Sequence, residues 1–135
     1  MDNQDLRRAG LKVTLPRVKI LEILTTAKEH HLSAEDVYRL LQESGEEVSL
    51  ATIYRVLTQF EQAGLVERHN FEGAHAIFEL KPEKHHDHLV CIYCGKVEEF
   101  VDDTIERRQQ KIAQDAGYRM TDHSLIIYGM CVSCQ

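Results

Sequence analysis

The chain has 135 residues with a formal net charge of −6; 43% of the residues are hydrophobic, 28% are charged, and tryptophan is absent. This composition is typical of a soluble globular protein, and the length suits one domain or two small ones. No run approaches the roughly 18 apolar residues that a membrane-spanning helix needs, and the opening MDNQDLRRAG lacks the apolar segment of a secretory signal. We therefore expect no membrane association and a cytoplasmic location.

The charged residues are unevenly distributed along the chain. Between Leu6 and Leu21 the only charged residues are basic, and between Val48 and Phe60 the single charged residue is Arg55. An acidic protein with such segments can still present a basic face. The negative net charge therefore does not exclude nucleic acid as a partner.

Helical patterns fill the first half of the chain. After a short helix over Asp5 to Ala9, three longer helices are predicted to begin at Thr14, Ser33 and Ser49, whose side chains can cap a helix N-terminus. The residues expected on the buried faces of these helices recur at helical spacing; they are Val18, Leu21, Leu24, Val37, Leu40, Leu41, Ile53, Leu57 and Phe60.

The segment LVERHNFEGAHAIFEL (65–80) follows the helices and predicts a β-hairpin around a loop that contains Gly73. Three helices followed by a hairpin are typical of a winged helix-turn-helix domain. The segment KPEKH, with Pro82, predicts a hinge after this domain. We therefore expect an α+β protein with a first domain over residues 1–81 and a second over residues 82–135.

The second domain shows alternating strand and helix patterns. Strands are predicted over residues 85–93, 96–101 and 123–130, and a helix capped by Asp102 over residues 103–117. The second domain is therefore predicted to be a mixed segment of strands and one helix.

Two Cys-x-x-Cys pairs, Cys91 with Cys94 and Cys131 with Cys134, lie in this second part. In a reducing compartment such pairs indicate metal binding before they indicate a disulfide. Four thiolates suit zinc, and a site closed by four protein ligands is structural because no coordination position remains open. The alternative is two reactive or incidental dithiols.

The tetrapeptide HHDH just before the first cysteine pair places four possible metal ligands in a row. If it is extended, His85 and Asp87 point to one face, while His86 and His88 point to the other. We therefore predict two mixed nitrogen and oxygen sites, with a solvated polar loop as the alternative. Their remaining ligands are not fixed by spacing; the candidates are His31, Glu79, Glu98, Glu99, Glu106 and His123. No such grouping supports a metal role for His30, His69 or His75, which we interpret as surface or DNA-proximal residues.

Several segments together resemble the ferric uptake regulator family of metal-dependent bacterial repressors. They are GLKVTLPRVKIL, SAEDVY, LATIYRVLTQFEQAGLV, HHDHLVCIYCGKVEEF and the terminal CVSC, which extend from about Leu6 to Cys134. The resemblance implies an N-terminal winged-helix DNA-binding domain and a C-terminal α/β dimerisation domain. It also implies a homodimer, with a tetramer as the alternative, and three metal sites.

The resemblance also assigns ligands to each site by position. The structural zinc site would use Cys91, Cys94, Cys131 and Cys134. The regulatory site would use His31, Glu79, His86, His88 and Glu99, with the choice between His86 and His88 left open. An additional site would use His85, Asp87, Glu106 and His123.

Fe(II) is the expected regulatory metal. The similar peroxide-sensing branch places Asp where Glu79 and Glu99 stand here, and the zinc-sensing branch uses a further cysteine that this chain lacks. By the usual order of affinity, Mn(II), Co(II) or Zn(II) could also bind in vitro.

The predicted partner is double-stranded DNA, bound at an A·T-rich palindromic operator that controls iron-uptake genes. The helix after Ser49 resembles the recognition helix, and the residues expected to contact DNA are Lys12, Arg17, Ser49, Thr52, Tyr54 and Arg55. For Tyr54 and Arg55 alone, the alternative is an exposed helix face. The rival classes are a zinc hydrolase or deaminase and a metal-storage protein. Because HExxH and the deaminase pattern are absent from the sequence, we expect no enzymatic activity.

Overall fold

A computed structural model describes residues 2–73, 75–82 and 84–135. The chain divides into two compact units, unit 1 over Met1–Glu83 and unit 2 over Lys84–Gln135. The division lies close to Pro82, where the sequence predicts the second domain to begin. No helix within the described ranges has the length and apolar character to cross a membrane.

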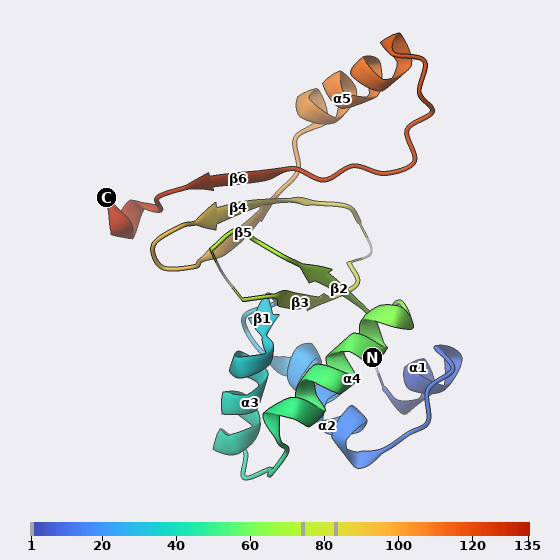
Figure 1. Ribbon diagram of the computed structural model, residues 1–135, viewed down its shortest axis with the longest axis vertical. Helices are drawn as coiled ribbons and strands as arrows, with labels where there is room; N and C mark the ends of the chain where they lie inside the picture. Colours follow the sequence, from blue (N-terminus) through green and yellow to red (C-terminus); the bar gives the residue numbers. More distant parts are fainter. Residues whose placement is uncertain (1, 74, 83) are drawn as a thin grey trace. The chain divides into compact units, whose positions relative to one another are not determined.

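Unit 1 contains four helices whose ends follow from local side-chain chemistry (Figure 1). They are α1 (Asn3–Arg8), α2 (Leu15–Thr26), α3 (Ala34–Glu43) and α4 (Leu50–Gln62). The predicted caps of the three longer helices are confirmed, since Thr14, Ser33 and Ser49 each accept a hydrogen bond from a backbone N–H of the first turn. Helix α1 begins two residues earlier than predicted because Asp2 and Asp5 form a capping box.

The apolar faces of these helices form the hydrophobic core of unit 1. Ile53, Leu57 and Phe60 on α4 are completely buried, as the sequence predicts. Leu21, Leu24, Val37 and Leu41 are buried with them, whereas Val18 and Leu40 are partly buried at the edge of the core. Helix α4 therefore has its apolar side fixed against the rest of the unit.

A three-stranded antiparallel sheet completes unit 1 and gives it the winged-helix fold. The predicted hairpin is confirmed as β2 (Val66–His69) and β3 (Ile77–Leu80). A further strand that the sequence does not predict, β1 (Leu32–Ser33), pairs with β3 on the other side, so the order is β1-β3-β2. Glu67 lies opposite Glu79 across β2 and β3, so both side chains are on the same face of the sheet.

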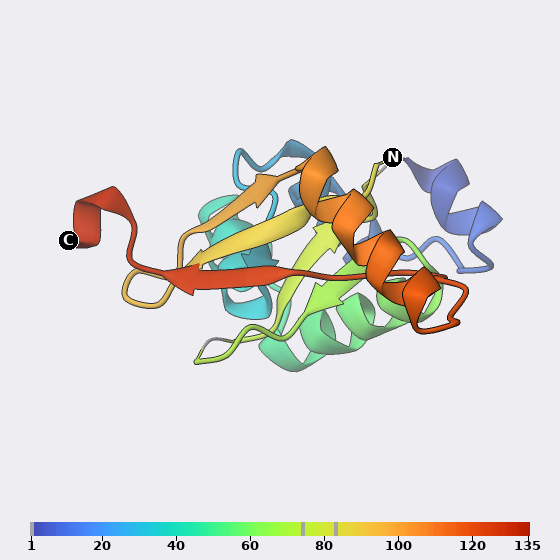
Figure 2. The ribbon, with the colours of Figure 1, turned by 90° about the horizontal axis from the view of Figure 1, so that it is seen from above.

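Unit 2 contains a second three-stranded sheet with the order β5-β4-β6 (Figure 2). Its elements are β4 (Asp87–Cys91), β5 (Val97–Phe100), α5 (Asp103–Asp115), β6 (Ile126–Gly129) and a 3₁₀ turn, η1 (Val132–Cys134). Strand β4 pairs antiparallel with β5 and parallel with β6. The predicted helix and three strands are confirmed, although β4 begins at Asp87 instead of His85 and η1 is not predicted.

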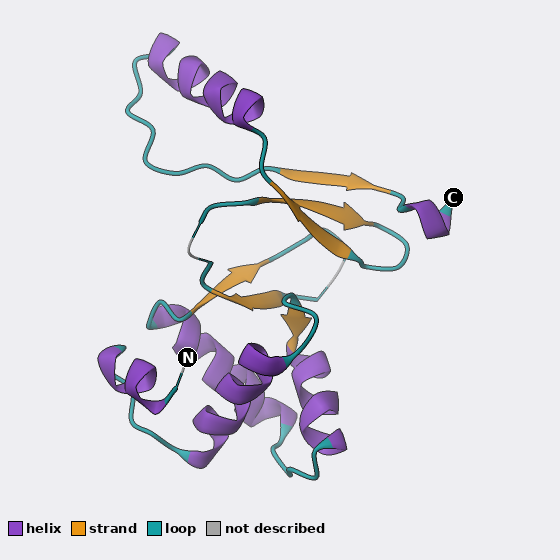
Figure 3. Cartoon of the chain, turned by 180° about the vertical axis from the view of Figure 1, so that it is seen from behind, coloured by secondary structure: helices purple, strands orange, loops and turns teal. Residues whose placement is uncertain are grey.

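Helix α5 packs less closely against the rest of unit 2 than the strands do. It contributes no buried residue, and it projects from the sheet instead of packing across it (Figure 3). Unit 2 also exposes apolar side chains on its strands, including Leu89 and Ile127. The unit therefore displays apolar surface that the described part of the chain does not cover.

Phe60→Ala is expected to destabilise unit 1 because it removes one of the two largest completely buried side chains of the core. The expected loss in the free energy of unfolding is about 3–5 kcal/mol, measured by urea unfolding followed by helical circular dichroism. Leu15→Ala serves as the control, since Leu15 is 65% exposed and its truncation is expected to cost less than about 0.5 kcal/mol. Equal losses for the two variants would contradict this description of the core.

Candidate functional site

The four cysteines of unit 2 form one cluster at the end of its sheet. Cys91 ends β4, Cys94 follows in the turn, Cys131 directly precedes η1, and Cys134 is the last residue of η1. The Sγ atoms of Cys94 and Cys131 are 3.7 Å apart, and those of Cys131 and Cys134 are 3.5 Å apart. Tetrahedral zinc with bonds of about 2.3 Å to sulfur separates its ligands by about 3.8 Å, whereas a disulfide requires about 2.05 Å. The thiols are free, and their spacing suits one zinc ion.

The pKa values of these thiols also indicate that a bound cation would be needed to ionise all four. The backbone N–H groups of Cys131 and Cys94 donate hydrogen bonds to Cys91 Sγ at 3.4 Å and 3.5 Å, and they lower the pKa of Cys91 to about 5. The neighbouring Cys131 and Cys91 raise the pKa of Cys134 to about 12. One thiolate therefore forms readily, while a full set of four requires a positive ion to offset their repulsion.

A second cluster in unit 2 contains the donors that the sequence assigns to an additional metal site. His85 Nε2 lies 3.1 Å from Asp87 Oδ1, and the rings of His85 and His123 are 4.1 Å apart. His123 Nε2 lies 3.9 Å from Glu106 Oε1. Asp87 is 1% exposed, and its Oδ2 has no hydrogen-bond partner among the described residues. A cation held by these four side chains would satisfy that buried oxygen.

The other face of β4 carries a different donor group. The His86 and His88 rings are 4.8 Å apart, and His86 Nε2 lies 3.4 Å from Glu99 Oε1. Glu99 stands opposite His88 in the β4–β5 pairing and so shares its face. Glu98, the other candidate on β5, stands opposite Leu89 and forms an ion pair with Lys96 at 3.0 Å. The structure thus groups Glu99, and not Glu98, with the two histidines.

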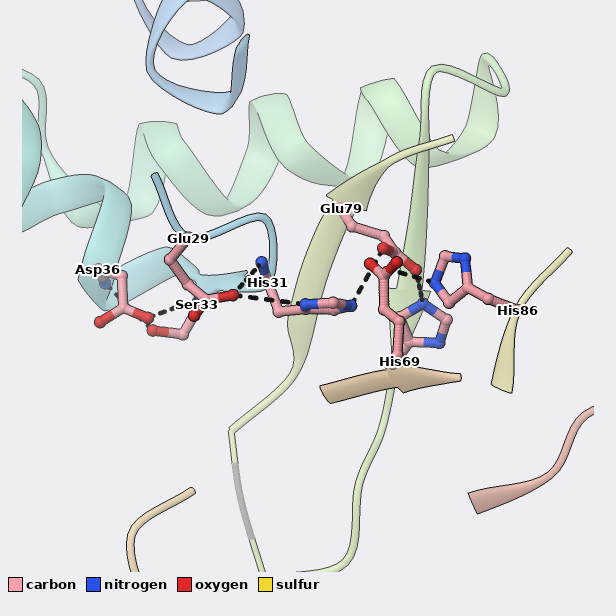
Figure 4. Close-up of polar contacts among 8 residues, drawn as sticks. Glu29, His31, Ser33, Asp36, His69, Glu79 and His86 are labelled. Carbon is pink, nitrogen blue, oxygen red and sulfur yellow. Dashed lines mark hydrogen bonds and ion pairs between the residues drawn. The ribbon is translucent and has the colours of Figure 1, made fainter. Parts of the chain in front are cut away.

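In unit 1, the carboxylate of Glu79 lies between two histidines (Figure 4). Its Oε2 is 3.1 Å from His31 Nε2, and its Oε1 is 2.6 Å from His69 Nε2. The Nδ1 atom of His31 is 3.4 Å from Glu29 Oε1, which fixes the orientation of the ring. His31 and Glu79, which are distant in sequence, therefore form a donor pair within one unit.

His69 contacts Glu79 in this site, and the sequence did not predict this contact. Its ring stacks on Phe71, with ring centroids 5.4 Å apart, and this contact orients Nε2 toward Glu79. Metal-binding carboxylates commonly have such outer partners. The hairpin register could have revealed it, because the pairing of Glu67 with Glu79 places His69 diagonally beside Glu79.

The predicted DNA-contacting residues belong to two parts of unit 1: Lys12 precedes α2 and Arg17 lies in it, whereas Ser49, Thr52, Tyr54 and Arg55 lie at the start of α4. Lys12, Ser49 and Arg55 are exposed, which suits contact with a nucleic acid. The Ser49 hydroxyl donates to Thr52 Oγ1 at 2.9 Å, so these two side chains already interact at the start of the helix. Arg55 has a long contact of 3.5 Å with Thr52 Oγ1.

Arg17 differs from the exposed residues because its guanidinium has partners within the unit. It donates to the carbonyl oxygen of Lys12 at 2.8 Å and to Gln59 Oε1 at 3.0 Å. Arg17 therefore connects the segment before α2 to α4, so it positions Lys12 in addition to any contact it makes with phosphate.

Tyr54 is the predicted DNA-contacting residue with the strongest partner. Its hydroxyl donates a hydrogen bond of 2.6 Å to Glu35 Oε1. This hydrogen bond lowers the pKa of Glu35 and raises the pKa of Tyr54. The pair is therefore a neutral phenol donating to a carboxylate at neutral pH.

A winged-helix unit combined with clustered metal donors defines the class of the protein as a metal-responsive, DNA-binding transcription regulator. Comparison with known sequences agrees, since the pattern described as "Ferric uptake regulator family" matches residues 8–128. The chain belongs to the ferric uptake regulator family. Members of this family are transcription regulators, and the chain is accordingly a metal-responsive transcriptional repressor.

The relatives match over nearly their whole length. A ferric uptake regulation protein of Legionella pneumophila is 64% identical over 99% of this chain and 98% of its own. The solved ferric uptake regulator of Vibrio cholerae is 56% identical, with a TM-score of 0.91 over 96% of this chain and 98% of its own. That of Pseudomonas aeruginosa, solved with manganese, is 56% identical, with a TM-score of 0.83 over 98% of both chains.

Proposed function

We propose that the protein is an Fe(II)-dependent repressor of iron-uptake genes that binds an A·T-rich palindromic operator as a homodimer in the bacterial cytoplasm. The observation that carries this proposal is the donor chemistry outside the cysteine cluster, which consists of imidazole and carboxylate groups alone. Such donors suit Fe(II) and Mn(II), whereas a thiolate would favour zinc. The relatives are named ferric uptake regulation proteins, which supports iron as the metal in the cell.

The regulatory ion is proposed to take ligands from both units. His31 and Glu79 are a preformed pair in unit 1, and His86, His88 and Glu99 are a preformed group in unit 2. An ion that binds donors from both would restrict the relative orientation of the units, and this restriction is the proposed switch. The Vibrio cholerae structure was described as revealing a structural rearrangement of the DNA-binding domains, which supports a mobile DNA-binding unit here.

The other two clusters are proposed to hold ions within unit 2. The four cysteines would bind structural zinc, which links the end of β4 to the segment after β6. The group around Asp87 would bind an additional divalent cation, which would coordinate the buried Oδ2 of Asp87. Zinc supplies cross-linking here, since four protein ligands leave no position for a reactant.

DNA recognition is proposed to rest on α4, with its N-terminal half in the major groove. Tyr54 would pack its ring on thymine methyl groups, and Arg55 would contact base edges or phosphate. Ser49, Thr52 and Arg17 would bind phosphate, and Lys12 would enter the narrow minor groove of A·T-rich DNA. A homodimer would present two such helices to the two halves of a palindrome.

The homodimer is proposed to form through unit 2. Among the described residues, Leu15 is the one large, exposed apolar side chain of unit 1, and the others belong to unit 2. Helix α5 has no buried residue, and β6 is an edge strand. A partner chain that packs on α5 and the sheet would cover this surface.

Operator binding by the wild-type chain is expected to require metal. Fluorescence anisotropy with a labelled A·T-rich inverted repeat would compare Mn(II), anaerobic Fe(II) and a chelator. Glu79→Ala, His88→Ala and Glu99→Ala are each expected to reduce the metal-dependent affinity for DNA by more than about tenfold. Loss of a residue that only supports a metal ligand already costs about tenfold in metal affinity, and loss of a ligand itself should cost more. Glu98→Ala is the matched control, because Glu98 neighbours Glu99 but lies on the opposite face. Wild-type binding that is unchanged by chelation would refute the proposed switch.

Cys91→Ser is expected to abolish zinc retention and to lower the thermal midpoint of unit 2, because structural zinc affinity is coupled to folding. Zinc released per chain would be measured with a colorimetric chelator, and unfolding by calorimetry. Ser133→Ala is the control and should retain zinc, because Ser133 lies between Cys131 and Cys134 but supplies no thiol. Full zinc content in the cysteine variant would exclude the four-thiolate site.

Ile127→Glu is expected to convert the dimer to a monomer by placing a charge on exposed apolar surface of β6. The mass would be measured by light scattering after size-exclusion chromatography. Leu15→Glu adds the same charge at an apolar residue of unit 1 that is 65% exposed, and it should leave the dimer intact. A dimer that persists in the Ile127 variant would show that the interface lies elsewhere.

A further inference from the structure

The two helices of the helix-turn-helix are joined by one short polar contact. Glu35 lies in the first turn of α3, and its Oε1 accepts a 2.6 Å hydrogen bond from the hydroxyl of Tyr54 on α4. Hydrogen bonds to an ionised carboxylate are shorter and stronger than those between neutral groups.

Glu35 stays ionised in this contact. The Tyr54 hydroxyl lowers the pKa of Glu35, and the charge of His75 acts in the same direction. The pKa of Tyr54 is raised, so the phenol keeps its proton and donates it to the carboxylate. The direction of the hydrogen bond is therefore fixed around neutral pH.

The Tyr54 ring is constrained at both ends. The partly buried ring packs against the hydrophobic core of unit 1, and the carboxylate of Glu35 holds its hydroxyl. The neighbouring Arg55 is exposed, and its one hydrogen bond within the described part of the chain is the long contact with Thr52. Of the two side chains proposed to reach bases, Tyr54 is thus held in place before DNA arrives, and Arg55 retains conformational freedom.

An ionised carboxylate next to a side chain that is proposed to contact DNA weakens binding to phosphate in general. The carboxylate of Glu35 therefore costs some affinity for DNA, and the fixed orientation of the Tyr54 ring offsets that cost. An apolar ring distinguishes thymine by contact with its methyl group, and such contact requires defined ring placement.

We propose that Glu35 is a positioning residue that determines operator specificity: by holding the hydroxyl of Tyr54, it sets the preference of the repressor for thymine over a base that lacks the methyl group. This inference rests on the proposed function, in which Tyr54 contacts thymine. Glu35 itself touches no base and acts through Tyr54.

The test measures affinity for two duplexes with the full-length, Mn(II)-loaded protein. One is the A·T-rich inverted repeat that the wild-type chain binds, and the other is the same duplex with deoxyuridine in place of thymidine. The ratio of the two dissociation constants reports recognition of the methyl group. For the wild-type chain this ratio is expected to be on the order of fivefold or more in favour of thymine.

Glu35→Ala is expected to bring this ratio close to one, and Glu35→Gln, whose amide oxygen still accepts a hydrogen bond, is expected to restore most of it. Tyr54→Phe removes the donor and should lower the ratio as Glu35→Ala does. Combining Tyr54→Phe with Glu35→Ala should lower it no further, because both changes remove one interaction. Glu43→Ala, an exposed carboxylate at the other end of α3, should leave the ratio unchanged.

A structural role alone would give a different result. If Glu35 only joined the two helices, Glu35→Ala would weaken binding to both duplexes equally and leave the ratio at the wild-type value, which would overturn the proposal. Additive effects in the double variant would overturn it as well. The proposed function fails separately, either when the wild-type chain shows no metal-dependent binding or when Tyr54→Ala leaves the thymine preference intact.

Discussion

The buried carboxylate of Glu79, placed between His31 and His69, is the contact through which unit 1 would respond to the proposed regulatory metal. Its neighbour in β3, Phe78, is completely buried in the core that also fixes α4. One short strand therefore presents a metal donor on one face and a core anchor on the other. A buried carboxylate is costly without partners. The two imidazoles lower that cost, and they keep the oxygens in position for a cation.

Unit 2 depends on a different kind of constraint. Its buried apolar residues are few among those described, with Val90 and Cys91 at the centre of the sheet and the polar Asp87 and His88 beside them. A unit of this size cannot obtain much stability from so small a core. Ions bound by the clustered thiols and by the other donor groups, as proposed, would supply the missing cross-links.

The sequence predicted what depends on neighbours along the chain, and it missed what depends on register and tertiary packing. The caps at Thr14, Ser33 and Ser49 are local features, and all three are confirmed. Strand β1 has only two residues, too few for a periodic pattern. The link between Glu35 and Tyr54 joins two helices, so no spacing reveals it.

The predicted site residues show the same division. Alternation along HHDH predicted which histidines share a face, and the contacts of His85 with Asp87 and of His86 with His88 follow it. The outer contact of His69 with Glu79 depends on the hairpin register, which was not fixed from sequence. The assignments of Lys12 and Arg17 to DNA came from the family resemblance, and the partners of Arg17 within unit 1 could not be foreseen from it.

Helix α5, which buries none of its residues within its own chain, has a consequence for how the protein behaves in a living cell. When a segment gains its order from a second copy, its stability depends on how many copies are present. Newly made or highly diluted chains would expose this helix to proteases first. Turnover of the repressor would then fall as its abundance rises, so that scarcity itself shortens its lifetime.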